Sequence, residues 1–149
     1  MNSETSDTKV SAGRARYLAE SGYSESTYTD PRFVIGIGKL NLTFRNPGKV
    51  HYHDLHHVVS GYTTGLVGEA EVSAYELRGG YHTFMIFFFT IGAVGIGLFL
   101  SPRRVIRAWR RAKGTRTLYD STIPYEDLLE MELVDLRSML NIPAGGFRS

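Results

Sequence analysis

The chain has 149 residues, a formal net charge of +2 and no cysteine. This length fits one domain with a substantial hydrophobic core, and the absence of cysteine excludes disulfides, thiolate zinc sites and cysteine nucleophiles. Any transition-metal site must therefore use imidazole and carboxylate groups.

The first thirty residues are polar and rich in Ser, Thr, Glu and Gly. This composition predicts a flexible N-terminal arm over residues 1–30, with one short helix from Gly13 to Glu20. The arm lacks the apolar run of a secretory signal, and its acids argue against a mitochondrial presequence. We expect the folded domain over residues 31–143 and a tail over residues 144–149. Within the domain, Phe33 to Leu42 predicts an extended segment or a short strand.

Apolar residues recur at helical spacing from Val50 onward, which predicts an all-α, compact helical domain. Gly61 and Gly79-Gly80 should end the first two helices, and Ser101-Pro102 should begin the fourth. The connection between the first two helices is short, so we expect them to be antiparallel neighbours. The predicted helices span Val50–Ser60, Thr63 or Thr64 to Arg78, Tyr81–Leu100, Pro102–Gly114, Tyr125–Glu130 and Leu133–Leu140.

Four of the five histidines lie within the seven residues 51–57. On a helix, His53 and His57 are one turn apart and point the same way, and Asp54 borders the same face. Glu69 lies twelve residues after His57 on the next predicted helix, and a tight return around Gly61 would bring its carboxylate over the site. We therefore predict a metal centre that is also the catalytic site, with the ligands His53, Asp54, His57 and Glu69.

Two imidazoles and two carboxylates suit a divalent metal. Zinc is our first choice, because it accepts mixed nitrogen and oxygen ligands and needs no redox partner; iron, cobalt, manganese and magnesium are alternatives. Glu69 could instead act as a base, with water in the remaining position. We expect His51 and His56 to face other directions and not to bind the metal.

These residues resemble a known family. The pattern His-Asp-x-x-His, eleven residues, then Glu is the signature of the Coq-four family of coenzyme Q (ubiquinone) biosynthesis proteins, and the chain has it from His53 to Glu69. The segment HDLHHVVSGYTTGLVGE is also similar to that family in its small, glycine-containing return. The C-terminal residues Tyr125-Glu126, Leu136-Arg137 and Leu140-Asn141-Ile142-Pro143 are similar to the family's closing pattern. The resemblance covers about residues 30–143.

The resemblance implies an all-α fold and metal-dependent oxidative decarboxylation of a polyprenylated hydroxybenzoate-like intermediate. The implied partners are a polyprenyl quinone precursor or another isoprenoid lipid, other quinone-biosynthesis enzymes, and a second copy of the chain in a homodimer. A second hypothesis is a non-enzymatic, lipid-binding organiser of a quinone-biosynthesis complex, with a structural metal. A third is a metal hydrolase acting on an isoprenoid phosphate, because His-Asp-x-x-His is similar to the His-Glu-x-x-His helix of zinc peptidases.

The stretch from Phe84 to Leu100 is seventeen residues without a charge, which is near the lower limit for crossing a bilayer. Three interpretations compete. The stretch could form a central apolar helix of the domain, line a tunnel for a prenyl tail, or span a membrane.

The segment from Ser101 to Lys113 carries six basic residues and no acid, whereas Tyr119 to Leu136 carries six acids and no base. The basic helix, which includes Trp109, either lies on an anionic membrane surface or packs on the core and pairs with the acidic tail. The first alternative makes the protein peripheral on the cytoplasmic side of a membrane, or on the matrix side of the mitochondrial inner membrane in a eukaryote. One basic helix without a base-reading motif does not predict nucleic-acid binding.

Overall fold

The computed structural model describes residues 9–22, 32–37, 40–45, 49–80 and 84–148. Within these ranges the chain is mainly helical, which confirms the predicted all-α domain. The helices in chain order are α1 (Val10–Ser21), α3 (Val50–Ser60), α4 (Leu66–Gly79), α5 (Phe84–Leu100), α6 (Pro102–Arg111), the short 3-10 helix η1 (Leu118–Asp120), α7 (Tyr125–Glu130) and α8 (Leu133–Met139).

The helix boundaries follow the local sequence signals closely. α3 and α7 have the predicted bounds, and α6 begins with Pro102 at a first-turn position, as the fixed φ of proline favours. α4 begins later than predicted, because Gly65 rather than Thr63 or Thr64 precedes its first residue. α6 ends at Arg111, one turn short of the predicted stop at Gly114.

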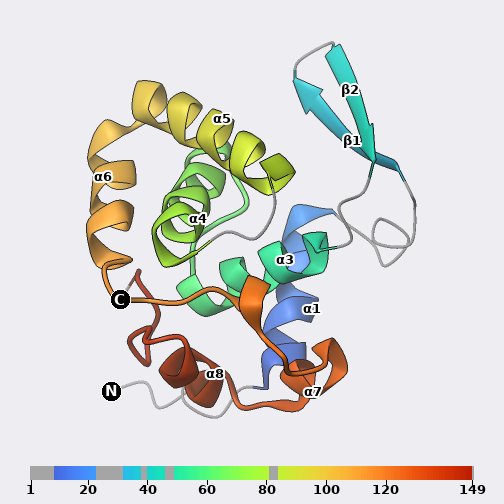
Figure 1. Cartoon of the computed structure of the whole chain (residues 1–149), viewed down its shortest axis with the longest axis vertical. Helices are drawn as coiled ribbons and strands as arrows, with labels where there is room; N and C mark the ends of the chain where they lie inside the picture. The colour runs from blue at the N-terminus through green and yellow to red at the C-terminus, as the bar shows by residue number, and fades with distance from the viewer. Residues whose placement is uncertain (1–8, 23–31, 38–39, 46–48, 81–83, 149) are drawn as a thin grey trace.

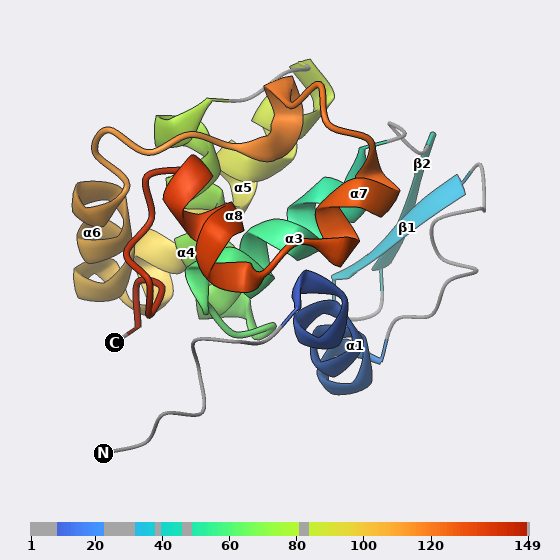
Figure 2. The same ribbon diagram turned by 90° about the horizontal axis from the view of Figure 1, so that it is seen from below.

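Two strands form a hairpin that the helical fold class did not include. β1 (Arg32–Ile37) pairs antiparallel with β2 (Leu40–Arg45), with Arg32 opposite Arg45. β1 lies where a short strand was one of the two predicted alternatives. The hairpin lies beside the packed helices in both ribbon views (Figures 1 and 2).

α4 is the central element of the helical body. α5 and α6 pack against it, and α1 packs against α3 (Figure 1). The core side chains come from α1, α3, α4, α6, η1, α7 and α8 and from the C-terminal segment up to Phe147. The largest fully buried apolar side chains are Tyr75, Leu55, Leu118, Leu128 and Leu136.

The short helix predicted from Gly13 to Glu20 is confirmed as part of α1 (Val10–Ser21), which packs on the folded body. Val10 and Tyr17 are buried, and the Val10 N–H donates to the Met131 carbonyl at 3.0 Å. Residues 1–8 and 23–31 lie outside the described residues. The expected tail also belongs to the folded body, because Phe147 is buried and its N–H donates to the Ser60 carbonyl at 2.8 Å. The hydrophobic core therefore extends from Val10 to Phe147.

An ion pair links α6 to α4. Glu71 on α4 is buried, and its two carboxylate oxygens accept from Arg104 Nε at 3.0 Å and from a terminal guanidinium nitrogen of Arg104 at 2.5 Å. A two-point pair of this kind fixes the orientation of both side chains. It therefore sets the position of the basic helix on the central one.

α5 is not the central helix that we expected from its composition. One face, with Thr90, Val94 and Gly97, lies against α4 and the core. The opposite face is exposed: Phe88 and Phe99 are 66% and 88% accessible to solvent. Among the described helices, none combines the length and the apolar character needed to cross a bilayer.

The contact between α5 and α4 gives a stability prediction. A Cβ at Gly97 would collide with the Ala70 side chain and lie 2.8 Å from Val105 Cγ2, whereas a Cβ at Gly95 would meet nothing within 4 Å. Gly97→Ala should therefore lower the free energy of unfolding by about 1–3 kcal/mol through overpacking. Gly95→Ala, the matched control, should raise it by up to about 1 kcal/mol through helix propensity. Urea unfolding of both variants checks this; equal stabilisation by both would contradict the close packing.

Candidate metal centre

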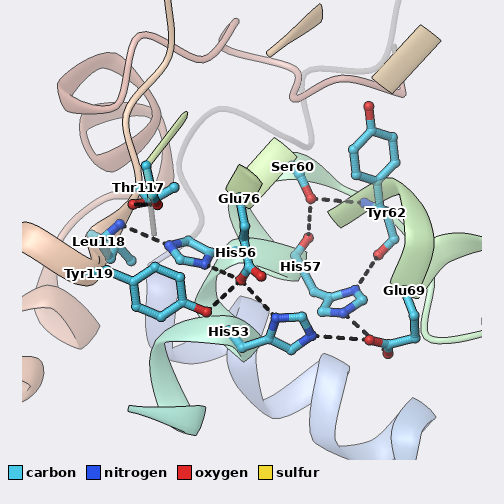
Figure 3. Close-up of polar contacts among 11 residues, drawn as sticks. His53, His56, His57, Ser60, Tyr62, Glu69, Glu76, Thr117, Leu118 and Tyr119 are labelled. Carbon is cyan, nitrogen blue, oxygen red and sulfur yellow. Dashed lines mark hydrogen bonds and ion pairs between the residues drawn. The ribbon is translucent and has the colours of Figure 1, made fainter. Parts of the chain in front are cut away.

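The turn between α3 and α4 brings the predicted ligands together. α3 ends at Gly61, and α4 begins only five residues later. Gly68 in the first turn of α4 lies so close to the Thr63 carbonyl that any side chain there would collide with it. This close approach folds the connection tightly and places Glu69, also in the first turn, over α3 (Figure 3).

Three of the four predicted ligands converge. Atoms of His53, His57 and Glu69 that could each bind a metal lie within 4.8 Å of one another. His53 Nε2 lies 3.1 Å from Glu69 Oε2, and His57 Nε2 lies 3.3 Å from Glu69 Oε1. Both imidazoles therefore present the same ring nitrogen to one carboxylate (Figure 3). This group could hold a metal ion.

The surroundings of His57 fit a metal ligand. Its Nδ1 lies 3.2 Å from the Tyr62 carbonyl oxygen, which can only accept, so Nδ1 carries the proton and donates. In the neutral ring, Nε2 then carries no proton and presents its lone pair. This atom is buried and makes no hydrogen bond among the described residues. A buried imidazole nitrogen with a lone pair directed toward a carboxylate has the chemistry of a metal ligand.

His53 is held by two carboxylates. Its Nδ1 donates to Glu76 Oε1 at 2.7 Å, and its Nε2 faces Glu69. Burial opposes the charged ring, but the carboxylates of Glu76 and Glu69 outweigh it and raise the pKa of His53 well above its ordinary value. Burial likewise opposes ionisation of Glu69, but its hydrogen bond to His53 and the neighbouring His57 ring lower its pKa to about 2. Without a metal, a proton on His53 Nε2 therefore occupies the place of a cation, and metal binding must displace it.

Glu76 joins the metal centre to the core. Its Oε1 accepts hydrogen bonds from His53 Nδ1, from His56 Nδ1 at 2.7 Å and from the Tyr119 hydroxyl at 2.8 Å. His56 Nε2 accepts the Leu118 N–H at 2.9 Å, so the His56 proton must lie on Nδ1. The carboxylate is buried, and its bonds to His53 and His56 keep its pKa far below the ordinary value despite the cost of burial. Glu76 thus fixes the ring of His53 with Nε2 directed at Glu69 (Figure 3).

The remaining histidines and Asp54 lie elsewhere. Asp54 is buried on α3 but is not a member of the converging group among the described residues, so its role as a fourth ligand stays a prediction. His56 uses both ring nitrogens in the core. His51 packs against the rings of Tyr52 and Tyr125. Both histidines therefore face other directions than the converging group, as expected.

The sequence analysis missed Glu76 and Tyr119. A signal for Glu76 was present, because it follows Glu69 by seven residues, which is two helical turns and the same face. Both carboxylates of that face therefore point at α3. No comparable signal marks Tyr119, which lies 43 residues after Glu76 and reaches it only through the tertiary fold.

Two imidazoles and one carboxylate leave coordination positions open for water or a substrate. Beside His57 lies an open depression of about 250 Å³, lined by Gly13, Tyr17, Val58, Tyr62 and Leu133 among others. Its lining includes His57 but neither His53 nor Glu69, so it reaches one member of the converging group.

No family model, curated protein or solved structure matches this chain in sequence or structure comparisons.

The metal centre predicts loss of binding when its imidazoles are removed. His53→Ala with His57→Ala should abolish stoichiometric zinc binding, because only the Glu69 carboxylate of the converging group remains. His51→Ala, two residues before His53 and six before His57 on the same helix, should bind zinc like the parent and serves as the control. Elemental analysis and calorimetric titration measure both. Stoichiometric metal in the double variant would reject the site.

The position of Glu76 predicts that a residue that does not bind the metal still affects the affinity for zinc. Glu76→Gln keeps the shape but removes the charge that orients His53, so zinc affinity should fall about 10- to 100-fold. The control is Glu71→Gln, which also removes a buried carboxylate from α4 but one paired with Arg104. It should lower stability and leave zinc affinity near the parent value. Equal affinities for the two variants in a zinc titration would contradict the positioning role.

Proposed function

We propose that this chain is a metal-dependent enzyme whose substrate is an acidic, prenylated ring compound. The observation that carries the proposal is the convergence of His53 Nε2, His57 Nε2 and the Glu69 carboxylate. Each imidazole has its other nitrogen engaged by an acceptor, Glu76 or the Tyr62 carbonyl, so the donor atoms are oriented before any metal arrives.

Zinc, our first choice from the sequence, suits a reaction in which the ion acts only as a Lewis acid. A set of two histidines and one glutamate is a common donor set in catalytic zinc sites, and two histidines with one carboxylate also suit iron(II). When bound, the ion supplies a Lewis acid that stabilises negative charge on a carboxylate or phenolate oxygen. Iron(II) becomes the better choice if the reaction requires dioxygen, because zinc has no redox chemistry.

The chain's own residues would then position the substrate. Glu69 is the most accessible member of the group, with 31% of its side chain exposed, so the open positions lie on its side. Leu66, three residues earlier on the same face of α4, is 65% exposed. An apolar side chain beside an accessible ligand favours a substrate with an acidic head and an apolar tail.

The specific reaction follows from the resemblance of His53 to Glu69 to the Coq-four family. It is the loss of carbon dioxide from a polyprenylated hydroxybenzoate, with a hydroxyl from water taking its place on the ring. Two electrons pass to dioxygen, which becomes hydrogen peroxide.

A metal hydrolase acting on an isoprenoid phosphate is the second candidate. The observation that favours it is the three-ligand set itself, since zinc hydrolases pair two histidines with a glutamate and keep a water in the open position. In that case Glu69 stays a ligand and the apolar tail still lies toward Leu66.

The proposal predicts turnover that depends on both the metal and oxygen. Metal-loaded protein should release carbon dioxide from prenylated 4-hydroxybenzoate under oxygen, and the rate should fall at least about a hundredfold in His57→Ala because the ion is lost. His51→Ala should retain the parent rate. Labelled carbon dioxide and product mass spectrometry measure the reaction with zinc and with iron(II).

Two results would contradict this proposal and favour one of its alternatives. Hydrolysis of a prenyl phosphate without decarboxylation would support the hydrolase. Tight binding of the prenylated acid without any turnover under oxygen would support a lipid-binding organiser with a structural metal.

A further inference from the structure

The outer faces of α5 and α6, two helices in contact, expose large apolar side chains that the described residues leave accessible to solvent. These side chains are 42–88% exposed. Folded monomers rarely leave such a set of large apolar side chains in water, because burying each one is favourable by about 1.5–3 kcal/mol. We call this set the α5–α6 surface, made of Phe88, Ile91, Ile96, Leu98, Phe99, Leu100, Ile106 and Trp109.

Helical spacing explains how α5 presents this surface while packing on α4. Phe88, Ile91 and Phe99 lie on one line of the helix, and Thr90, Val94 and Gly97 lie on the opposite side. The inner line is small or polar and fits closely against Ala70 and Val105. The outer line is bulky and apolar, so contact with α4 cannot account for it.

The charged residues in and around α5 and α6 are all basic. Residues 77–119 contain eight Arg or Lys residues and no Asp or Glu. On α6, Arg103, Arg107 and Arg110 are exposed and recur at helical spacing next to Ile106 and Trp109. Among the described residues these three arginines have no ion-pair partner, whereas Arg104 is paired with buried Glu71. The basic helix therefore does not use these three charges to hold the fold.

In Figure 1, α5 runs along the top of the helical body and α6 runs down its left side. α5 and α6 contact each other and both pack on α4, whereas α1 and α7 lie away from α6 in both ribbon views (Figures 1 and 2). Arg78, in the last turn of α4, places its guanidinium 5.0 Å from the centre of the Trp109 ring. This contact holds an amphipathic ring and a cation together at the edge of the apolar area.

We propose that the α5–α6 surface docks onto the surface of an anionic lipid bilayer. The outer line of α5 would enter the boundary between head groups and acyl chains, and Trp109 with the three free arginines would lie at the level of the lipid phosphates. A second copy of the chain fits less well, because pairing two such surfaces would bring like charges together. An anionic bilayer satisfies both the apolar area and the charge.

This surface shares α4 with the metal centre. Ala70, which contacts Gly97 of α5, is the residue after the ligand Glu69. Exposed Leu66 lies one turn before that ligand. A molecule embedded in the bilayer would therefore lie near the accessible side of the centre. The docking itself rests on the surface alone and holds whether or not the centre binds a metal.

Sedimentation of the full chain with phosphatidylcholine vesicles, with and without phosphatidylserine, tests the proposal. Binding should require phosphatidylserine and weaken with salt. Arg107→Gln should weaken it about fivefold, as expected for one cation near an anionic membrane. Phe99→Ser should weaken it at least about tenfold through loss of one inserted aromatic ring. Arg16→Gln, an exposed arginine of α1, removes the same charge away from the surface and should have no effect.

Each outcome decides the question. Unfolding midpoints near the parent value identify variants that keep their fold, which the high exposure of Phe99 and Arg107 favours. Binding that does not depend on phosphatidylserine, or that Arg16→Gln weakens as much as Arg107→Gln, overturns the proposal. The proposal is also overturned if the chain does not bind vesicles and sedimentation equilibrium shows a dimer that Phe99→Ser dissociates. In that case a second copy of the chain covers the surface.

Discussion

One buried oxygen of Glu76 accepts hydrogen bonds from His53, His56 and Tyr119. An ionised carboxylate in the core is costly unless such donors surround it, and removing the partners of a buried charge typically costs roughly 3–5 kcal/mol. The three donors come from α3 and from the segment at η1, and Glu76 itself lies on α4. This shared acceptor therefore holds three parts of the chain in one arrangement. His56 extends the network to the Leu118 backbone, so the position of η1 depends on it as well.

The same network orients the imidazoles of the candidate metal centre. An imidazole binds a metal well only if the correct nitrogen is free and the ring is held. Glu76 and the Tyr62 carbonyl each take one Nδ1 proton, and the two Nε2 atoms are left facing Glu69. The cost of burying Glu76 is thus partly offset by the His53 charge in the metal-free protein, and a bound cation would take over that role.

α4 divides the molecule into two regions with different chemistry. The face with Glu69 and Glu76 meets the histidines of α3, whereas Ala70 and Glu71 meet α5 and α6. Small residues at the α4–α5 contact let the apolar helix approach closely, and the Glu71–Arg104 pair orients the basic one. Because consecutive residues of one helix serve both regions, the contact with α5 and α6 and the candidate metal centre lie within one turn of α4.

The sequence by itself determined the elements and most of the centre. Helix ends at Gly61 and Pro102 and the one-turn spacing of His53 and His57 depend on local geometry, which neighbouring residues set directly. Glu69 was also predictable, because the return that carries it is short. Tertiary structure decided what local patterns cannot: that polar residues 10–21 pack as α1, that Glu76 and Tyr119 meet across 43 residues, and that apolar α5 lies outside. Composition records how apolar a helix is, but only its packing partners determine which of its faces remain exposed.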